Sequence, residues 1–237
     1  MKEKIVGFFK KYVAPTDLTC SVCGRENFNG KVVCDDCLKE LVKIETPCEK
    51  CGRQNNFGAK LCKECSESEI EVTKAVSEYE YSGETAALMR RFKYKGNKYL
   101  KDFFADGMID AFFKAGITAD TVTFVPMSKR EYISRGFFNQ AELLAKAFCS
   151  KTGLPLNDIL VKNKHTVRQA TLNYSERQKN LKGVFSVKKG INLKGVSVLV
   201  IDDVLTTGAT ADAVGKTLFD KGVKNVYFLT VASVTHK

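Results

Sequence analysis

Apolar runs alternate with helical patterns along the last two-thirds of the chain. Three runs, 121–125, 196–201 and 225–231, are continuous and rich in β-branched residues, which is typical of strands buried on both faces of a sheet. Apolar residues recur at helical spacing in segments that begin near residues 83, 100, 139 and 210. This alternation predicts an α/β domain with a parallel sheet flanked by helices over residues 72–237, and the loosely alternating segment 72–81 is predicted as an edge strand.

The stretch 196–210 carries the clearest chemistry. Two carboxylates, Asp202 and Asp203, follow the predicted strand at once, and a turn of small and hydroxyl-bearing residues comes next: Thr206, Thr207, Gly208, Ala209 and Thr210. A strand, a tight turn and a helix N-terminus form a phosphate site, because free backbone N–H groups and the helix dipole point at the anion. The paired acids lie where open α/β sheets bind ligands, and they can accept hydrogen bonds from sugar hydroxyls or hold Mg²⁺ through water.

This stretch resembles the phosphoribosyl pyrophosphate signature of the type I phosphoribosyltransferases. The resemblance implies a type I phosphoribosyltransferase-like sheet, with Asp202 and Asp203 holding the ribose and the loop from Thr206 to Thr210 holding the ribose phosphate. It also implies that phosphoribosyl pyrophosphate binds with Mg²⁺ and that a hood within 160–187 closes over the substrate. The loop after the strand at 121–125 would grip the pyrophosphate, and three residues there are suited to it: Ser128, Lys129 and Arg130.

Eight of the nine cysteines form two copies of one pattern, the second displaced by 28 residues from the first. The ligand candidates are Cys20, Cys23, Cys34 and Cys37 in the first copy, and Cys48, Cys51, Cys62 and Cys65 in the second. Paired Cys-x2-Cys turns provide four thiolates for a tetrahedral metal, so we predict a tandem zinc ribbon at residues 16–66 with structural Zn²⁺. Each second turn is expected to be brought back by a short hairpin.

The pattern leaves several properties of this module open. Each metal could use one repeat or borrow turns from both, and the module could be a structural or docking element or could contact nucleic acid or protein. Residues 64–71 are acidic and polar, and we interpret them as a linker to the larger domain.

Composition favours anionic partners without identifying one. The 237 residues carry a net charge of +11, which suits phosphates, nucleic acid or a membrane surface. No apolar run is long enough to span a bilayer and the apolar run at the start is too short for a secretory signal, so we expect a cytoplasmic protein with reduced thiols and no transmembrane segment. Residues 1–15 are predicted as an amphipathic helix, which would dock on the protein's own body or, alternatively, lie peripherally at a membrane or bind a partner.

Basic and aromatic residues interleave at 90–99, in a segment that follows the helical pattern begun at Gly83. Aromatic faces that stack on bases and lysines that meet phosphates would suit a nucleic-acid surface. Composition alone favours another interpretation, a helix end whose aromatic residues enter the core and whose lysines are solvated.

Taken over the whole chain, from about Cys20 to about Ser233, the sequence resembles the ComF family of competence-associated proteins. The motifs that carry the resemblance are Phe92-Lys-Tyr-x-Gly96, Arg135-Gly-Phe, Asn139-Gln-Ala-Glu, Thr166-x-x-Gln169-x-x-Leu172, Arg177 with Asn180, Gly183 and Phe185, and the Asp-Asp signature. The chain departs from the family pattern at Phe137-Phe138, where one aromatic is usual, and at Glu131, Lys162 and Lys164, where arginine is expected.

The family resemblance implies a role in DNA uptake during natural competence, with other competence proteins such as the DNA-uptake translocase as partners. Two hypotheses follow. The chain could be a phosphoribosyltransferase, or it could be a non-catalytic adaptor or single-stranded DNA-binding protein with the same fold.

Overall fold

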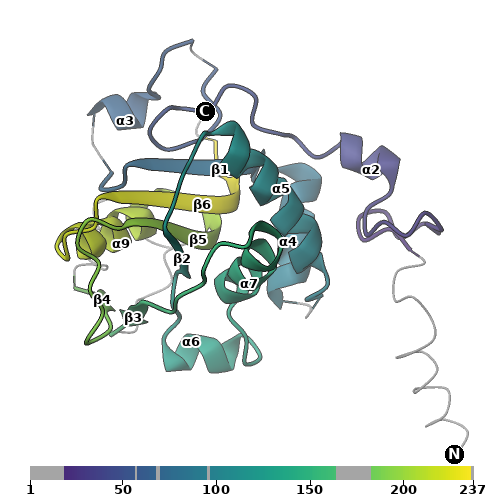
Figure 1. Ribbon diagram of the computed structural model, residues 1–237. Coiled ribbons are helices and arrows are strands. Elements are labelled where there is room, and N and C mark those ends of the chain that lie inside the picture. Colours follow the sequence, from purple (N-terminus) through teal and green to yellow (C-terminus); the bar gives the residue numbers. More distant parts are fainter. Residues whose placement is uncertain (1–18, 57, 68–69, 95–96, 164–182, 236–237) are drawn as a thin grey trace, which may run out of the picture.

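The computed structural model describes residues 19–56, 58–67, 70–94, 97–163 and 183–235 (Figure 1). The amphipathic helix predicted at 1–15 and most of the predicted hood lie outside the described residues.

Four parallel strands form the central sheet, in the order β1-β6-β5-β2. They are β1 (Lys74–Glu80), β6 (Asn225–Ser233), β5 (Ser197–Leu205) and β2 (Thr121–Phe124). The two strands in the middle of the sheet contain two of the three continuous apolar runs, as expected for strands covered on both faces. The predicted α/β class with a parallel sheet is therefore confirmed, and β1 is an edge strand as expected.

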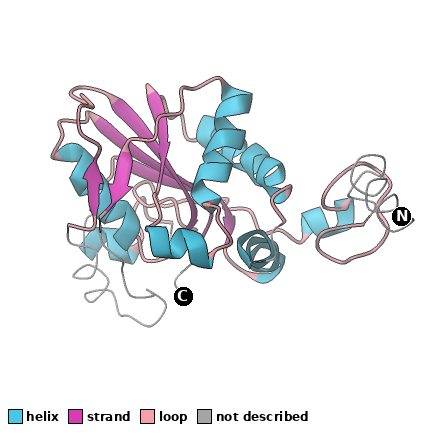
Figure 2. Ribbon diagram, turned by 90° about the horizontal axis from the view of Figure 1, so that it is seen from below, coloured by secondary structure: helices cyan, strands magenta, loops and turns pink. Residues whose placement is uncertain are grey.

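Helices cover both faces of this sheet (Figure 2). One face carries α4 (Gly83–Tyr94), α5 (Leu100–Lys114) and α7 (Gln140–Thr152), whereas α9 (Ala209–Phe219) packs on the other. The short α6 (Lys129–Ser134) follows the carboxyl end of β2. In the part of the chain that the structure describes, no helix is both long and apolar enough to cross a bilayer.

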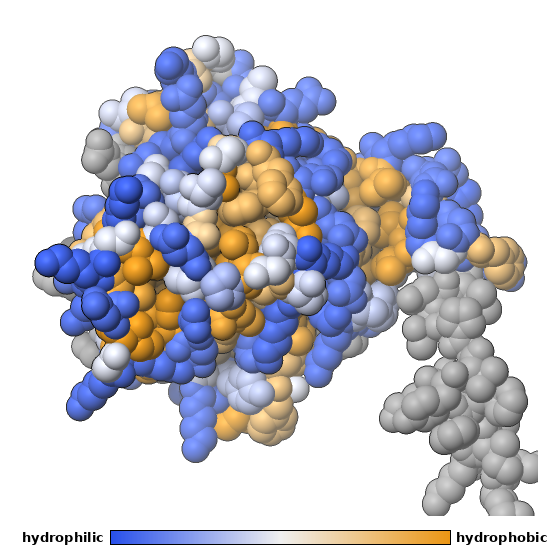
Figure 3. Space-filling model, in the orientation of Figure 1, coloured by the Kyte–Doolittle hydropathy of each residue, from blue (hydrophilic) through white to orange (hydrophobic). Residues whose placement is uncertain are grey.

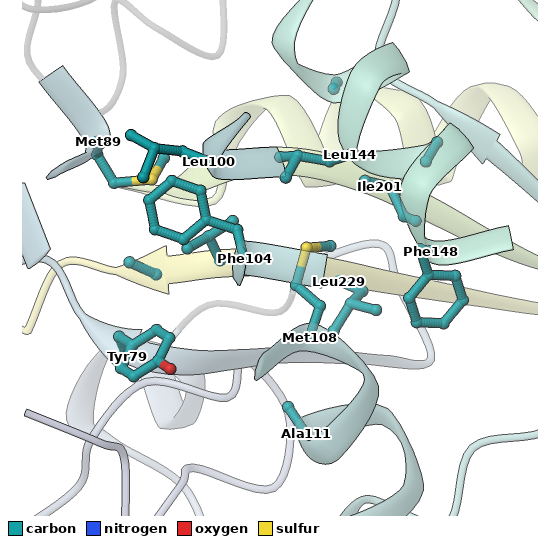
Figure 4. Close-up of a cluster of buried hydrophobic side chains, with 14 of the residues drawn as sticks. Tyr79, Met89, Leu100, Phe104, Met108, Ala111, Leu144, Phe148, Ile201 and Leu229 are labelled. Atoms are coloured by element: carbon teal, nitrogen blue, oxygen red, sulfur yellow. The ribbon is translucent and has the colours of Figure 1, made fainter. Parts of the chain in front are cut away.

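The alternation of side chains along β5 divides the core into two clusters. Leu199 and Ile201 face α5 and α7, while Val198 and Val200 face α9, and all four are fully buried. Figure 4 shows part of the first cluster, including Phe104, Leu144 and Phe148. The ring of Phe104 also meets that of Phe92 edge to face, with the ring centroids 5.6 Å apart. A strand buried on both faces holds the residues that follow it in a defined position.

A small second sheet marks the base of the predicted hood. Strand β3 (Leu160–Lys162) pairs antiparallel with β4 (Phe185–Val187). These strands flank the segment 164–182, which is outside the described residues, so the predicted hood itself stays a prediction.

In each cysteine repeat, the second Cys-x2-Cys pair lies at the start of a short helix and not on a second hairpin turn, which corrects the expectation. These helices are α2 (Asp35–Lys39) and α3 (Lys63–Glu67). The helix α3 also takes up the first part of the segment that we interpreted as a linker. The first pair of each repeat does lie in a tight turn, closed by antiparallel bridges between Thr19 and Glu26 and between Pro47 and Gln54.

The two repeats dock on different faces of the sheet. Cys20, Cys37 and neighbouring apolar residues join the core cluster of α4 and α5, and Arg91 of α4 donates hydrogen bonds to the carbonyls of Ser21 and Val22. Cys48, Cys51 and Cys65 join the cluster of α9 instead. Equivalent sequences therefore contact different parts of the larger domain.

The segment after the second repeat lies directly on α9. The Glu71 amide donates to the Asp212 carboxylate at 3.0 Å, and Gly215 faces the carbonyl of Glu71 so closely that a Cβ there would be 1.4 Å from the oxygen. Only a residue without a side chain allows this contact, and the chain leaving the cysteine module is thereby held against the helix that follows the predicted phosphate loop.

We expect Gly215→Ala to lower the free energy of unfolding by about 1–3 kcal/mol or more, because the added methyl overlaps the Glu71 backbone. At a helical position with space for the methyl group, Gly→Ala would instead raise the free energy of unfolding, because alanine has the higher helix propensity. Urea denaturation measures the effect, with Lys221→Ala, an exposed lysine just beyond α9, as the near-neutral control. Equal stability of Gly215→Ala and the wild-type protein would contradict the close docking.

Candidate sugar-phosphate site and cysteine clusters

The acidic pair lies on β5 just beyond the point where the neighbouring strand β2 ends. Phe124 pairs with Ile201 at the end of β2, whereas β5 continues beside β6 through Asp202 to Leu205. The strand thus runs through the acids and does not end before them. Because β5 has a neighbour on one side only beyond Ile201, the acids lie where a parallel sheet opens a crevice for ligands.

Asp203 forms an ion pair with Lys93 in the last turn of α4, with Oδ2 and Nζ 2.9 Å apart and both side chains about 15% exposed (15% for the lysine, 14% for the acid). Burial lowers the pKa of Lys93, but the charge of Asp203 outweighs it and the net shift is upward, so the lysine is cationic. The interpretation of residues 90–99 as a solvated helix end is therefore right for Phe92, which is buried, and wrong for Lys93.

Asp202 accepts a hydrogen bond from the Asp203 amide at 2.8 Å. Burial, and next the negative charge of Asp203, raise the pKa of Asp202 to about 7, although Lys93 and Lys162 attract the charged form. This pair of neighbouring carboxylates is consequently a place where an added cation or a hydroxyl donor relieves repulsion.

A second ion pair lies nearby, between Lys162 of β3 and Glu131 of α6, at 2.8 Å. Glu131 also accepts from the amide and hydroxyl of Ser128 at 2.8 Å each, while its own amide donates to the Ser128 hydroxyl in a capping box. Burial raises the pKa of Glu131, but Lys162 and Ser128 outweigh it and the net shift is downward. Glu131, at a position where arginine was expected, is thus paired with Lys162.

The structure places the three predicted pyrophosphate residues at the start of α6. Ser128 is the buried N-cap, and the side chains of Lys129 and Arg130 are exposed. Within the described residues, neither Lys129 nor Arg130 forms an ion pair with Asp202 or Asp203.

The predicted phosphate loop connects β5 to α9. Gly208 is the N-cap of α9 in the left-handed conformation, with φ 85°, which glycine adopts without strain. Among the described residues, no protein acceptor binds the amides of the four residues that follow Thr206: Thr207, Gly208, Ala209 and Thr210. The Thr207 hydroxyl is also buried there without a hydrogen-bond partner. These donors are free for an anion.

Other residues of the site hold its elements together. Asn139 donates to the carbonyl of Val125 after β2, and Gln140 donates to the carbonyl of Lys93 at the end of α4. The motif Asn139-Gln thus anchors the helix that carries Lys93. Lys93 lies in the motif Phe92-Lys-Tyr-x-Gly96, and that position is the signal in the sequence for its place beside Asp203.

Each cysteine repeat forms its own cluster. Cys20, Cys23, Cys34 and Cys37 form one, and Cys48, Cys51, Cys62 and Cys65 the other, with all sulfur atoms of a cluster within 4.8 Å of one another. Tetrahedral zinc with bonds of about 2.3 Å needs sulfurs about 3.8 Å apart, and Cys51 and Cys62 are separated by 3.7 Å. Backbone amides of Cys34 and Cys62 donate to Cys20 and Cys48 at 3.3 Å. Both clusters are consistent with structural zinc, and neither borrows a turn from the other repeat.

An exposed basic and aromatic surface lies on and beside α6. Lys129 and Arg130 share it with Tyr132 and Phe137, whose rings meet edge to face, and Phe137 is 66% exposed. Phe137 has a φ of 62°, while the adjacent Phe138 is buried. Figure 3 shows apolar atoms at the lower edge of this face, where α6 lies in Figure 1.

Comparison with known proteins confirms the resemblance to the ComF family. The chain is 36% identical to Competence protein F of Haemophilus influenzae over 104 residues, 43% of this chain and 45% of the relative. It is 33% identical to Competence protein ComFC of Streptococcus pneumoniae over 57% of each chain, and 30% identical to that of Bacillus subtilis over 62% of this chain and 58% of the relative. The matched regions thus span about half the length of these relatives. No family model matches.

Solved structures with a similar arrangement include phosphoribosyltransferases. An allosteric regulatory enzyme of purine biosynthesis is 19% identical over 60% of this chain and 30% of its own, with a TM-score of 0.40. A hypoxanthine phosphoribosyltransferase of Staphylococcus aureus is 16% identical over 57% of this chain and 64% of its own, with a TM-score of 0.34. TM-scores this low give no further support for the fold, which is defined by the strand order of the sheet.

We expect the purified protein to contain two zinc ions per chain, because each cluster has four thiol ligands. Cys23→Ser, in the first cluster, should reduce the ratio to about one, and Cys149→Ser, a buried cysteine outside both clusters, should leave it at two. Plasma mass spectrometry measures the ratio. One ion per wild-type chain would contradict two separate sites.

The raised pKa of Asp202 predicts a particular dependence of stability on pH. Between the unfolded pKa near 4 and the folded value of about 7, the folded state binds the extra proton, so stability falls as the pH rises through this window. Asp202→Asn should remove that fall, and the exposed Asp220→Asn should retain it. Melting temperatures of ligand-free protein from about pH 5.5 to 8 test this, and parallel profiles for wild type and Asp202→Asn would contradict the shift.

Proposed function

We propose that this chain binds phosphoribosyl pyrophosphate with Mg²⁺ at the carboxyl end of β5 and acts in DNA uptake. The observation that carries the proposal is the loop of unengaged amides directly after a half-buried acidic pair. Few ligands need both an anion site and a pair of hydroxyl acceptors a few ångströms apart, and a sugar phosphate is one.

The ribose phosphate would occupy the loop from Thr206 to Thr210. Its oxygens accept from the free amides of Thr207, Gly208, Ala209 and Thr210, and the N-terminus of α9 adds a favourable dipole. The buried Thr207 hydroxyl, which has no partner among the described residues, would gain one.

The ribose hydroxyls would donate to Asp202 and Asp203. Lys93 holds Asp203 in place through their ion pair, and an ammonium group has donors left for a ligand oxygen. The pKa of about 7 for Asp202 means that ligand hydroxyls or a cation would favour the charged form near neutral pH. Carboxylate oxygens are also suitable ligands for Mg²⁺, directly or through water.

The pyrophosphate would lie toward α6 and β3, where Lys129, Arg130 and Lys162 supply positive charge. Glu131 lies among them, and its pairing with Lys162 and Ser128 removes most of the repulsion that it would exert. Bound Mg²⁺ would neutralise pyrophosphate and stabilise it as a leaving group.

The arrangement suits a phosphoribosyltransferase. In that reaction the bond from the anomeric carbon to pyrophosphate breaks, pyrophosphate leaves with the bonding electrons, and a nucleophile forms the new bond to the same carbon. Asp202 and Asp203 would orient the ribose by its hydroxyls while Lys162 and the α6 residues stabilise the leaving charge.

A non-catalytic, single-stranded DNA-binding role is the second candidate, and the α6 surface supports it. Exposed Tyr132 and Phe137 could stack on bases while Lys129 and Arg130 meet phosphates. This function would suit the competence-related relatives, and other competence proteins, including a DNA-uptake translocase, are proposed partners.

Calorimetry with phosphoribosyl pyrophosphate and Mg²⁺ tests the first proposal. Asp202→Asn with Asp203→Asn should weaken binding by about a hundredfold or more, because two charge-assisted hydrogen bonds are lost. Asp220→Asn is the matched control and should bind like wild type. A wild-type protein that does not bind the ligand would overturn the proposal.

The same variants separate the two candidate functions. Affinity for single-stranded DNA should fall steeply with salt, and Lys129→Ala with Arg130→Ala should flatten the slope by about 1.4. The double asparagine variant should retain DNA binding if the surfaces are separate. Equal loss of DNA and sugar-phosphate binding would indicate one shared site, and release of pyrophosphate would identify turnover.

A further inference from the structure

One residue of the second cysteine repeat reaches the proposed phosphate loop. Arg53 follows the turn of Cys48 and Cys51, is only 4% exposed, and donates from Nη2 to the carbonyl of Thr206 at 2.6 Å. Its other terminal nitrogen, Nη1, donates to Glu64 of α3. The guanidinium thus joins the two cysteine-bearing parts of this repeat to the loop between β5 and α9.

The contact controls the direction of a loop amide. In a trans peptide the carbonyl oxygen and the following N–H point in opposite directions. Because Arg53 holds the Thr206 carbonyl toward the cysteine module, the Thr207 N–H is directed away from the module, where no described backbone group accepts from it. Gly208 also lies close to Arg53, since a Cβ there would be 3.4 Å from Ile70 and 3.7 Å from Arg53 Nη2.

The turn that presents Arg53 is itself held by backbone hydrogen bonds to Cys48 and by packing on β1. The Cys48 amide donates to the Arg53 carbonyl at 2.8 Å, and the Gly52 amide donates to the Cys48 carbonyl at 2.9 Å. Gly52 packs so closely on β1 that a Cβ would be 2.4 Å from the carbonyl of Ala75. Arg53 therefore extends from a turn that is held rigidly against β1.

The first repeat provides an internal comparison. Arg25 occupies the equivalent position, but its side chain is 67% exposed and contacts Cys23 and Asp36 within its own repeat. The two arginines have the same local sequence, Cys-Gly-Arg, and only the second touches the larger domain at the proposed site.

We propose that Arg53 is a positioning residue for sugar-phosphate binding, through which the second cysteine module holds the phosphate loop in its binding conformation. This inference rests on the proposed function. It gives the second repeat a role in ligand binding that the first repeat does not have. Loss of the Arg53 contact lets the Thr206–Thr207 peptide rotate and lowers the affinity for the phosphate.

The test compares Arg53→Met with Arg25→Met. Methionine retains an aliphatic stem for the buried position but donates no hydrogen bond. Calorimetry with ribose 5-phosphate should show an affinity lower by about tenfold or more for Arg53→Met and unchanged for Arg25→Met. Affinity for inorganic pyrophosphate with Mg²⁺, which would use α6 and Lys162, should be the same in both variants, a selectivity that a general loss of structure would not produce.

The controls distinguish failure of this inference from failure of the proposed function. A wild-type protein that binds neither ribose 5-phosphate nor pyrophosphate would overturn both. A wild-type protein that binds, with Arg53→Met binding ribose 5-phosphate equally well, would overturn only the role of Arg53. Zinc content and melting temperature show whether each variant folds. If Arg53→Met does not fold, Arg53→Leu decides, since leucine is also apolar and donates no hydrogen bond to the Thr206 carbonyl; an unchanged affinity there would overturn the proposal.

Discussion

The structure depends on the way that β5 is enclosed. Over its first half, the strand lies between β6 and β2 with helices on both faces, and all of its side chains from Val198 to Ile201 are buried. Beyond Ile201, β2 has ended while β6 continues. The same strand is thus enclosed over its first half and has a neighbour on one side only beyond Ile201, so the acidic pair is held in place without being sealed in the core.

Polar groups at this opening are arranged in compensated pairs. Lys93 balances Asp203, and Lys162 balances Glu131, each at hydrogen-bond distance. Among the described residues Asp202 has no ion-pair partner, and burial and the charge of Asp203 raise its pKa to about 7. Partly buried charges need partners, and here the partners come from α4, α6 and β3, which are distant in sequence. The result is a cluster of charged groups at the carboxyl end of β5 in which Asp203 and Glu131 each already have a lysine partner.

The two cysteine repeats show how one local pattern can take different places in a fold. Their internal geometry is alike, with a tight turn followed by a short helix and four sulfur atoms close together. The first packs beside α4 and α5, and the second packs beside α9. A small module without much core of its own can be docked wherever it finds apolar surface. Docking therefore decides that Arg25 is exposed and Arg53 lies beneath a loop.

Periodicity and spacing in the sequence were enough to predict the strands around 121–125, 196–201 and 225–231, the helices between them, and two sets of four thiols, because these features depend on nearby residues. The acid pair and the Thr-Thr-Gly-Ala-Thr loop were recognisable for the same reason. The tertiary structure alone decided that Lys93 pairs with Asp203, that Lys162 pairs with Glu131, and that Arg53 reaches Thr206, across 153 residues of sequence. No local pattern encodes such contacts, since they arise when a parallel sheet and a docked module bring distant segments together, and burial then makes a partner necessary for each charge.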